Sequence, residues 1–327
     1  MIAQNKKQKT AYLLGYFGAL ALFFGLSAAV LMHNFSATLN QSTLSAQNGS
    51  PMVLGAVSAP LRGAEEPKKQ TLFKQTGEPQ LSEVTAKSFL VYDASTGQVL
   101  LSKNPRQRMG IASLTKLLTA YTAYQVLDLN SKIEIPGGET GSNTNPSLKV
   151  LPGDKIKALD LFDAMLVGSE NDAAGILAGQ IKAVSGTSTI GLMNQFAQDL
   201  GMQDSHFGNP YGFDLGNNYS TAEDLQKLVD ATQKLHAFVS LENKTGYGFK
   251  SLLGNSYFAK ATNRLVGKVQ NVYAIKTGYT ETSLGSIAIK TYLSDRPVIV
   301  ILLGSQAREN DAIRLKDEAE KNFSLDR

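Results

Sequence analysis

From about residue 81 onward, the apolar and polar positions follow the periods expected of strands and helices. Two short apolar runs, 88–92 and 98–102, flank the polar segment Asp93-Ala-Ser-Thr-Gly97, and this pattern predicts a β-hairpin. The other expected strands lie near the end of the chain, at 272–276, 286–293 and 298–303. The last two are joined by a predicted turn at 294–297.

The segment between these strands has a helical pattern. Residues 113 to about 127 carry apolar side chains on most faces, which predicts a largely buried helix. Two further helices, 159–167 and 173–181, meet at a polar turn. The remaining expected helices are 190–200, one opened by Ser220 and Glu223 as a capping box, and 309–323. The order of strands, helices, strands and a last helix predicts a mixed α/β fold whose sheet joins both ends of the domain.

The N-terminal part of the chain has a different pattern. Lys6, Lys7 and Lys9 precede 11–32, a run without charged residues that would span roughly 33 Å as a helix. We expect a cytoplasmic tail at 1–10, a membrane anchor at 11–32 and an extracytoplasmic remainder. A cleavable signal peptide is the alternative, although its apolar core is normally only about 7–15 residues long.

A polar segment separates this anchor from the globular part of the chain. Residues 33–80 are rich in Ser, Thr, Gln, Asn, Gly and Pro and lack sustained periodicity, as a flexible linker does. The predicted catalytic domain is therefore 81–327. Its expected location is the outer face of a cell membrane, held by a single N-terminal span.

Composition narrows the possible chemistry. The chain of 327 residues has a net charge of only +4, which gives no reason to expect a nucleic-acid partner. It contains no cysteine, which excludes disulfides, thiol catalysis and cysteine-bound metals. The three histidines, His33, His206 and His236, are scattered, so neither a histidine-based zinc site nor a Ser-His-Asp triad is expected.

The first chemical motif is Ser113-Leu-Thr-Lys116. Residues three apart share one face of a helix, so Lys116 can reach Ser113. A serine hydroxyl becomes a good nucleophile when a base removes its proton, and a neutral lysine amine can be that base. Neighbouring leucines and a second cation, for which Lys276 is the candidate, would lower the pKa of Lys116. A chance pair on a solvated face is the structural alternative, but this helix has little polar face.

Two further motifs follow in the chain. Ser169-Glu170-Asn171 lies between two helices, where it could relay a proton and hold a substrate carbonyl, or could simply cap a helix. Lys276-Thr277-Gly278 ends a strand-like run and offers a cation, a hydroxyl and room for a substrate backbone. The same tripeptide at 244–246 lacks a preceding strand-like run, and Ser102-Lys103-Asn104 precedes the nucleophile, so both are regarded as chance repeats.

The three motifs, in this order, resemble those of the serine-type D-alanyl-D-alanine carboxypeptidases, the low-molecular-weight penicillin-binding proteins related to class A β-lactamases. The resemblance extends over the globular part through these further stretches: Ala112–Ala120, Ser169–Ala174, Met193-Asn194, Leu200–Met202, Phe207–Phe213, Tyr219–Ala222 and Ile275–Thr280. It implies a β-lactamase/DD-peptidase-like fold, in which an antiparallel sheet packs against a helical cluster.

The resemblance also implies roles for individual residues. Ser113 would be acylated, with Lys116 as its base, and Ser169 and Asn171 would complete the catalytic group. The substrate would lie against Lys276, Thr277, Gly278 and Tyr279, with the backbone N–H groups of Ser113 and Tyr279 as the oxyanion hole. The implied substrate is the D-Ala-D-Ala end of a peptidoglycan stem peptide, β-lactams would be covalent inhibitors, and no cofactor or metal would be needed.

Some positions depart from the family pattern. Glu170 is large where relatives often have a small residue, so it could alter the mouth of the site, and Ser283-Leu284-Gly285 replaces a usual Ala-Gly pair. Arg308 and Arg314 are both candidates to meet the substrate carboxylate, and we expect Arg314. A DD-endopeptidase, a β-lactamase and an inactive wall-binding relative remain alternative functions.

Overall fold

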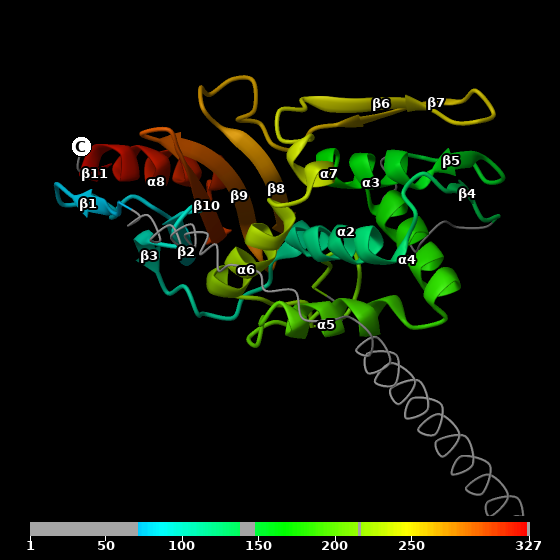
Figure 1. Ribbon diagram of the computed structural model, residues 1–327, viewed down its shortest axis with the longest axis horizontal. Helices are drawn as coiled ribbons and strands as arrows, with labels where there is room; N and C mark the ends of the chain where they lie inside the picture. The colour runs from blue at the N-terminus through cyan, green and yellow to red at the C-terminus, as the bar shows by residue number, and fades with distance from the viewer. Residues whose placement is uncertain (1–70, 138–147, 215–216, 326–327) are drawn as a thin grey trace, which may run out of the picture. The chain divides into compact units, whose positions relative to one another are not determined.

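A five-stranded antiparallel sheet runs through the domain (Figure 1). Its strands are β2 (Ser88–Asp93), β3 (Val99–Lys103), β8 (Tyr273–Thr280), β9 (Leu284–Leu293) and β10 (Arg296–Ser305). Their order across the sheet is β3-β2-β10-β9-β8, so strands from both ends of the domain are neighbours. The computed structural model describes residues 71–137, 148–214 and 217–325. Strand β8 is at one edge of the sheet, where a ligand can approach its backbone.

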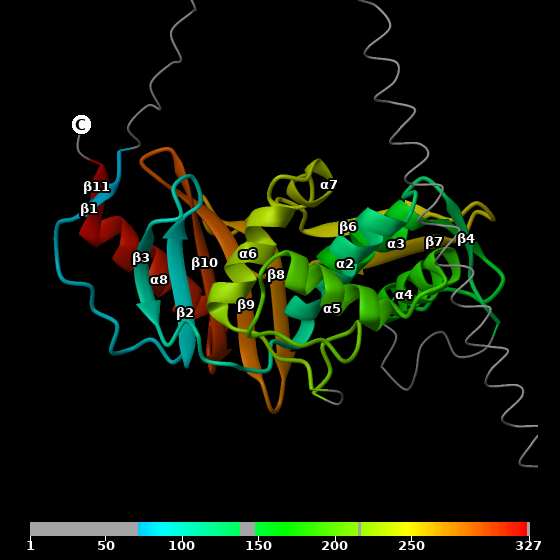
Figure 2. The same ribbon diagram turned by 60° about the horizontal axis from the view of Figure 1, so that its bottom comes forward.

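The two faces of this sheet bury different cores, because side chains alternate along each strand. Leu90 and Ile301 point into the larger core, which the helices of the central segment complete. Val91 and Leu302 point into a second core, which is covered by helix α8 (Arg308–Asn322). The turned view in Figure 2 shows α8 and the helical cluster separated by the sheet.

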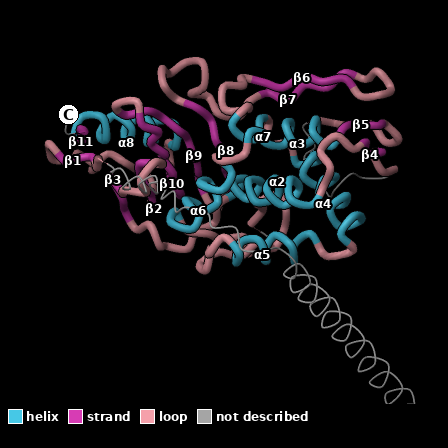
Figure 3. Tube along the Cα trace, viewed as in Figure 1, coloured by secondary structure: helices cyan, strands magenta, loops and turns pink. Residues whose placement is uncertain are grey.

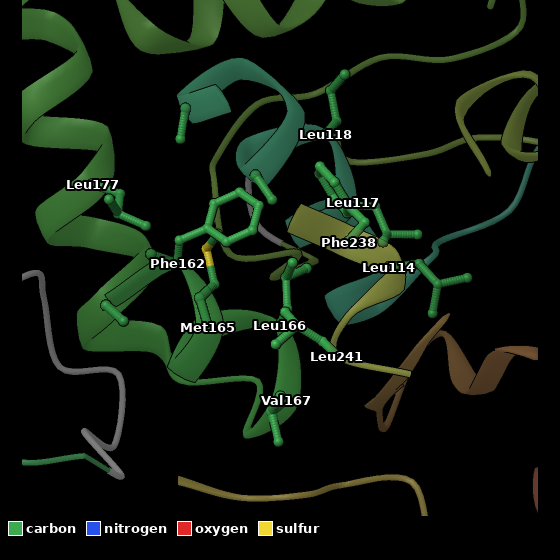
Figure 4. Close-up of a cluster of buried hydrophobic side chains, with 14 of the residues drawn as sticks. Leu114, Leu117, Leu118, Phe162, Met165, Leu166, Val167, Leu177, Phe238 and Leu241 are labelled. Carbon is green, nitrogen blue, oxygen red and sulfur yellow. The ribbon is translucent and has the colours of Figure 1, made fainter. Parts of the chain in front are cut away.

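The larger core belongs to a cluster of helices on the other side of the sheet (Figure 3). These helices are α2 (Thr115–Val126), α3 (Ala158–Val167), α4 (Asn171–Ser185), α5 (Thr189–Asp199), α6 (Ala222–Thr232) and α7 (His236–Val239). Helix α2 contacts α3, α4, α5 and α6. Figure 4 shows Leu117 of α2 beside Phe238 of α7, and these residues belong to the same buried cluster as Leu118 of α2 and Phe162 and Met165 of α3. The predicted buried helix is therefore the centre of the domain.

Three small two-stranded sheets complete the described fold. They are β1 (Phe73–Gln75) with β11 (Phe323–Leu325), β4 (Lys132–Glu134) with β5 (Lys155–Lys157), and β6 (Gly246–Lys250) with β7 (Ser256–Lys260). The β6–β7 hairpin crosses above α3 in the view of Figure 1 and contacts it.

The predicted α/β fold, with a sheet from both ends of the domain packed on helices, is confirmed. Several boundaries differ. Strand β1 lies inside the predicted linker, because it pairs with β11 and buries Phe73. Strand β8 continues through Lys276-Thr277-Gly278 to Thr280, whereas the prediction ended the strand at Lys276.

The cap of α6 is also displaced by one residue. The Thr221 side chain accepts the N–H of Asp224 at 3.0 Å, and the Ser220 hydroxyl instead lies 2.7 Å from that of Ser205. Ser220 cannot start the helix because its backbone forms a bridge with Met109.

The predicted cytoplasmic tail, anchor and most of the linker lie outside the described residues. Within the part of the chain that the structure describes, none of the helices has the length and apolar character needed to cross a bilayer.

Candidate active site

Ser113 lies at the point where a short turn enters the central helix. The 3₁₀ turn η1 (Ala112–Leu114) directly precedes α2, so Ser113 lies at the positive end of a helix and is partly exposed. Ala112 has a φ of +47°, an uncommon conformation for a residue with a side chain. This turn places Ser113 next to strand β8, which η1 contacts.

The amine of Lys116 is beside this serine and is cut off from water. Its Nζ lies 3.0 Å from Ser113 Oγ and donates a hydrogen bond of 2.7 Å to the Tyr211 carbonyl oxygen. The residue is 0% exposed. Burial lowers the pKa of Lys116 to about 7, and the nearby Glu170 carboxylate opposes that change. A base with a pKa near 7 is suited to removing a serine proton at neutral pH.

The loop at 207–213 supplies the anchor for Lys116. The Asn209 side-chain oxygen accepts the backbone N–H groups of Tyr211, Gly212 and Phe213 at 3.1, 2.8 and 3.2 Å. Gly212 has a φ of +93°, and a Cβ there would lie 1.9 Å from the Ala112 carbonyl oxygen. The loop is thus held tightly against η1.

This loop is one of the stretches that carry the family resemblance, but the resemblance implied no role for Tyr211 or Gly212. The Asn-Pro-Tyr-Gly string, a strong turn signal, could have drawn attention to it.

The second motif lies in the turn between α3 and α4. Ser169 has a φ of +61°, and Asn171 is the first residue of α4; both are partly exposed. A serine in the left-handed region is strained, and such residues persist where the surrounding structure holds them. The sequence left two roles open for this motif, capping a helix or acting on a substrate. In the structure, the turn holds the motif in a defined conformation that leaves Ser169 and Asn171 partly exposed.

Glu170 is buried between these two residues, at 3% exposed. A Cβ on Gly168 would lie 2.3 Å from Glu170 Oε1, so the carboxyl group packs against this glycine and does not extend into the mouth of the site. Burial, with a contribution from Asp172, raises the pKa of Glu170 to about 8, while Lys276 and Lys116 oppose the change. The large middle residue is therefore a buried titratable group beneath the site.

The third motif lies in the middle of the edge strand β8. Lys276 and Thr277 are each 2% exposed. A Cβ on Gly278 would lie 2.8 Å from the backbone N of Ser113, so only glycine lets the strand approach the nucleophile this closely. Tyr279, the next residue, is 62% exposed at the edge of the sheet.

The two lysines of the site are coupled. Burial lowers the pKa of Lys276, and the positive charges of Lys116 and Arg308 lower it further. The sequence led us to expect that burial among leucines and the charge of Lys276 both depress the pKa of Lys116. In the structure, burial is the first cause of the lowered pKa of each lysine, and the repulsion between the two cations adds to it.

The repeated tripeptide at 244–246 lies elsewhere. It leads into β6, which pairs with β7 outside the five-stranded sheet. The choice of Lys276 therefore agrees with the position of β8 beside η1.

The expectation for the arginine needs correction. Arg314 is exposed and forms an ion pair with Glu83. Arg308, in the first turn of α8, donates from Nη1 to the Gly278 carbonyl oxygen at 2.7 Å. A Cβ on Gly285 would lie 3.0 Å from Arg308 Cβ. This glycine, in the Ser-Leu-Gly segment that departs from the family pattern, therefore gives the arginine access to β8.

A serine hydroxyl beside a buried lysine amine, next to the edge strand of an antiparallel sheet, is the arrangement found in the class of serine acyl-transferases that use a lysine base. The chain belongs to the D-alanyl-D-alanine carboxypeptidase family, whose pattern matches residues 74–307. The family expected from the sequence is confirmed.

Individual relatives and solved structures agree with this assignment. The chain is 31% identical over 260 residues to D-alanyl-D-alanine carboxypeptidase DacD of Escherichia coli, covering 75% of this chain and 66% of the relative. It is 30% identical to a D-alanyl-D-alanine endopeptidase of Pseudomonas aeruginosa, covering 74% and 79%. The Streptomyces K15 DD-transpeptidase structure superposes with a TM-score of 0.68 at 26% identity, covering 75% of this chain and 99% of that one.

Proposed function

We propose that the chain is a serine DD-carboxypeptidase that removes the terminal D-Ala from peptidoglycan stem peptides and is acylated by penicillins. The observation that carries the proposal is the 3.0 Å approach of a fully buried Lys116 amine to the partly exposed Ser113 hydroxyl. Family membership supplies the substrate class.

The proposed reaction has two halves. Neutral Lys116 accepts the Ser113 proton while Oγ bonds to the carbonyl carbon of the penultimate D-Ala, and the N–H groups of Ser113 and Tyr279 stabilise the oxyanion. The amide bond breaks, and the departing D-Ala amine takes up the proton that Lys116 accepted from Ser113, which leaves Lys116 neutral again. Water then attacks the ester and frees the shortened peptide and Ser113. Ser169 and Asn171 are proposed to relay protons and hold the substrate amide, and Lys276, Thr277 and Gly278 line the substrate strand.

Release of D-Ala from a pentapeptide tests this function. Ser113→Ala should reduce kcat by at least about 10³-fold because the acyl-enzyme cannot form. Ser102→Ala is the control, because Ser102 on β3 begins the chance Ser-x-Asn match at 102–104, and it should keep full activity. D-Ala release that is undiminished in Ser113→Ala, or lost equally in both variants, would contradict the proposal.

We also propose that the chain is anchored in the cell membrane by 11–32, with the catalytic domain outside the cytoplasm. The support comes from the sequence: three lysines precede a long run without charge. Protease treatment of intact spheroplasts should digest the domain. In untreated cells, the protein should have its full-length mass and stay in the membrane fraction. A shortened, freely released protein would instead indicate a cleaved signal peptide.

A further inference from the structure

A basic groove leads away from the catalytic strand. Its cavity has a volume of about 760 Å³. It is lined by Thr245, Lys260, Ala261, Thr262, Asn263, Arg264, Val266, Lys268 and Arg308. Most of these residues belong to the connection between β7 and β8, drawn in Figure 1 beside the edge strand. Four of them are cationic, and none of the lining residues among those described is acidic.

Three of the four cations have no charge partner in the part of the chain that the structure describes. Arg308 forms an ion pair with Glu309, at 3.0 Å. The exposed Lys260, Arg264 and Lys268 have no carboxylate within 4 Å among residues 71–137, 148–214 and 217–325. Like charges gathered along one groove repel each other, and an anionic ligand would relieve that repulsion.

The groove is joined to the catalytic site at two points. The Thr262 hydroxyl lies 2.6 Å from the Thr277 hydroxyl. Arg308 contacts the Gly278 carbonyl, and the Gly278 backbone lies against Ser113. The inner end of the groove therefore begins where the leaving group of an acyl transfer would lie.

A free D-Ala leaving group is too small to need this groove. It carries one carboxylate, which Thr277 and Arg308 can meet at the inner end. Lys260, Arg264 and Lys268 would then have no ligand atoms to bind. A larger leaving residue, with the same carboxylate beside the scissile amide and a side chain that continues into an acidic peptide, would extend along them.

We propose that this groove, named here the basic groove, binds a carboxylate-bearing peptide attached to the leaving residue. The inference rests on the proposed function, because it takes the scissile amide to lie at Ser113 and Gly278. It extends that function from terminal D-Ala to cross-linked peptides, whose cleavage is a DD-endopeptidase reaction.

The test compares leaving groups that share one acyl half. The purified full-length chain is given three substrates: one that releases D-Ala, one whose leaving D-lysine carries two glutamates on its ε-amine, and a matched one that carries two glutamines. The wild-type kcat/KM should be about fivefold higher for the glutamate substrate than for the glutamine substrate, and added salt should reduce this preference.

The double variant Arg264→Gln/Lys268→Gln should bring that ratio close to one, mainly through KM, since it removes two exposed groove charges. The control Lys132→Gln/Lys182→Gln removes the same charge from exposed lysines on β4 and α4 and should keep the ratio. Equal wild-type rates for the two extended substrates, failure to cleave either one, or the same ratio in both double variants would overturn the proposal. Absence of D-Ala release from the first substrate would instead contradict the proposed function itself.

Discussion

At the scale of single residues, the proposed chemistry depends on keeping Lys116 neutral beside Ser113. Burial lowers the pKa of Lys116 to about 7, because an ammonium group loses its hydration in the core. Below that pH the amine holds its proton and cannot accept one from Ser113. The second-order rate of acylation by a fluorescent penicillin should therefore rise with pH and be half-maximal near pH 7. A rate that is constant from pH 5.5 to 8.5 would contradict this assignment.

Glu170 makes the stability of the domain depend on pH. Its pKa is about 8 in the folded protein, above the ordinary 4.5, so its stabilising effect is complete below about 4.5 and is lost as pH rises through 8. Relative to wild type, Glu170→Gln should gain on the order of 2–4 kcal/mol between pH 4.5 and pH 8.5.

Urea unfolding of the two proteins at both pH values measures this difference. Glu134→Gln, on the surface strand β4, is the control and should show a much smaller change. The same stability difference at both pH values would show that Glu170 does not titrate as described.

Motif order located Ser113, Lys116 and Lys276, but it could not choose between two arginines. Arg308 and Arg314 are on the same helix, and the choice depends on which turn of α8 meets β8 and β9. That contact is made by Arg308 with Gly278, over Gly285, and no local pattern in the sequence encodes it.

At the scale of elements, the loop 207–213 and the strand β8 hold η1 between them. Gly212 and Gly278 permit these approaches, since a side chain at either position would strike the backbone around Ser113. The site is therefore positioned by backbone contacts as much as by its catalytic side chains.

Gly212→Ala tests this positioning. Gly254, in the β6–β7 turn, is a matched control because its φ of +92° is nearly that of Gly212, but a Cβ there meets no atom of the described residues within 4 Å. Gly254→Ala should cost about 1 kcal/mol of stability and leave acylation intact. Gly212→Ala should slow penicillin acylation by 10²-fold or more, on the order expected when catalytic groups move by 1 Å. Equal acylation rates in the two variants would contradict the account.

Apolar periodicity predicted most of the helices and strands, because each buries one face in a core. It placed the end of β8 too early, at Lys276, because Thr277–Thr280 have no apolar run and belong to the strand through their pairing with β9. The cap of α6 was misplaced for a similar reason, since the backbone bridge of Ser220 to Met109 is a long-range contact.

At the scale of the whole domain, the two ends of the described chain are tied together. Strand β1 pairs with β11, and Phe73 and Phe323 are both buried in the core beneath α8. Strand β1 lies within 33–80, the predicted linker, because three residues in a polar context carry no periodic signal and their partner lies at the far end of the chain.

Phe323→Ala should therefore lower stability without altering the chemistry. The expected loss is about 3–5 kcal/mol, as for other buried phenylalanines, and the rate of penicillin acylation at 25 °C should be unchanged. Phe258→Ala, on β7, is the control because that ring is 65% exposed, and it should cost well under 1 kcal/mol. Equal melting temperatures for the two variants would show that β11 is not part of the core.

The central claim is that Ser113 becomes acylated with Lys116 as its base. The most direct measurement is mass spectrometry of the full chain after brief exposure to benzylpenicillin, followed by peptide mapping. The account predicts a mass increase of one penicillin, located on the peptide that contains Ser113 and lost in Ser113→Ala. An adduct on any other residue, or no adduct on the folded wild-type chain, would contradict it.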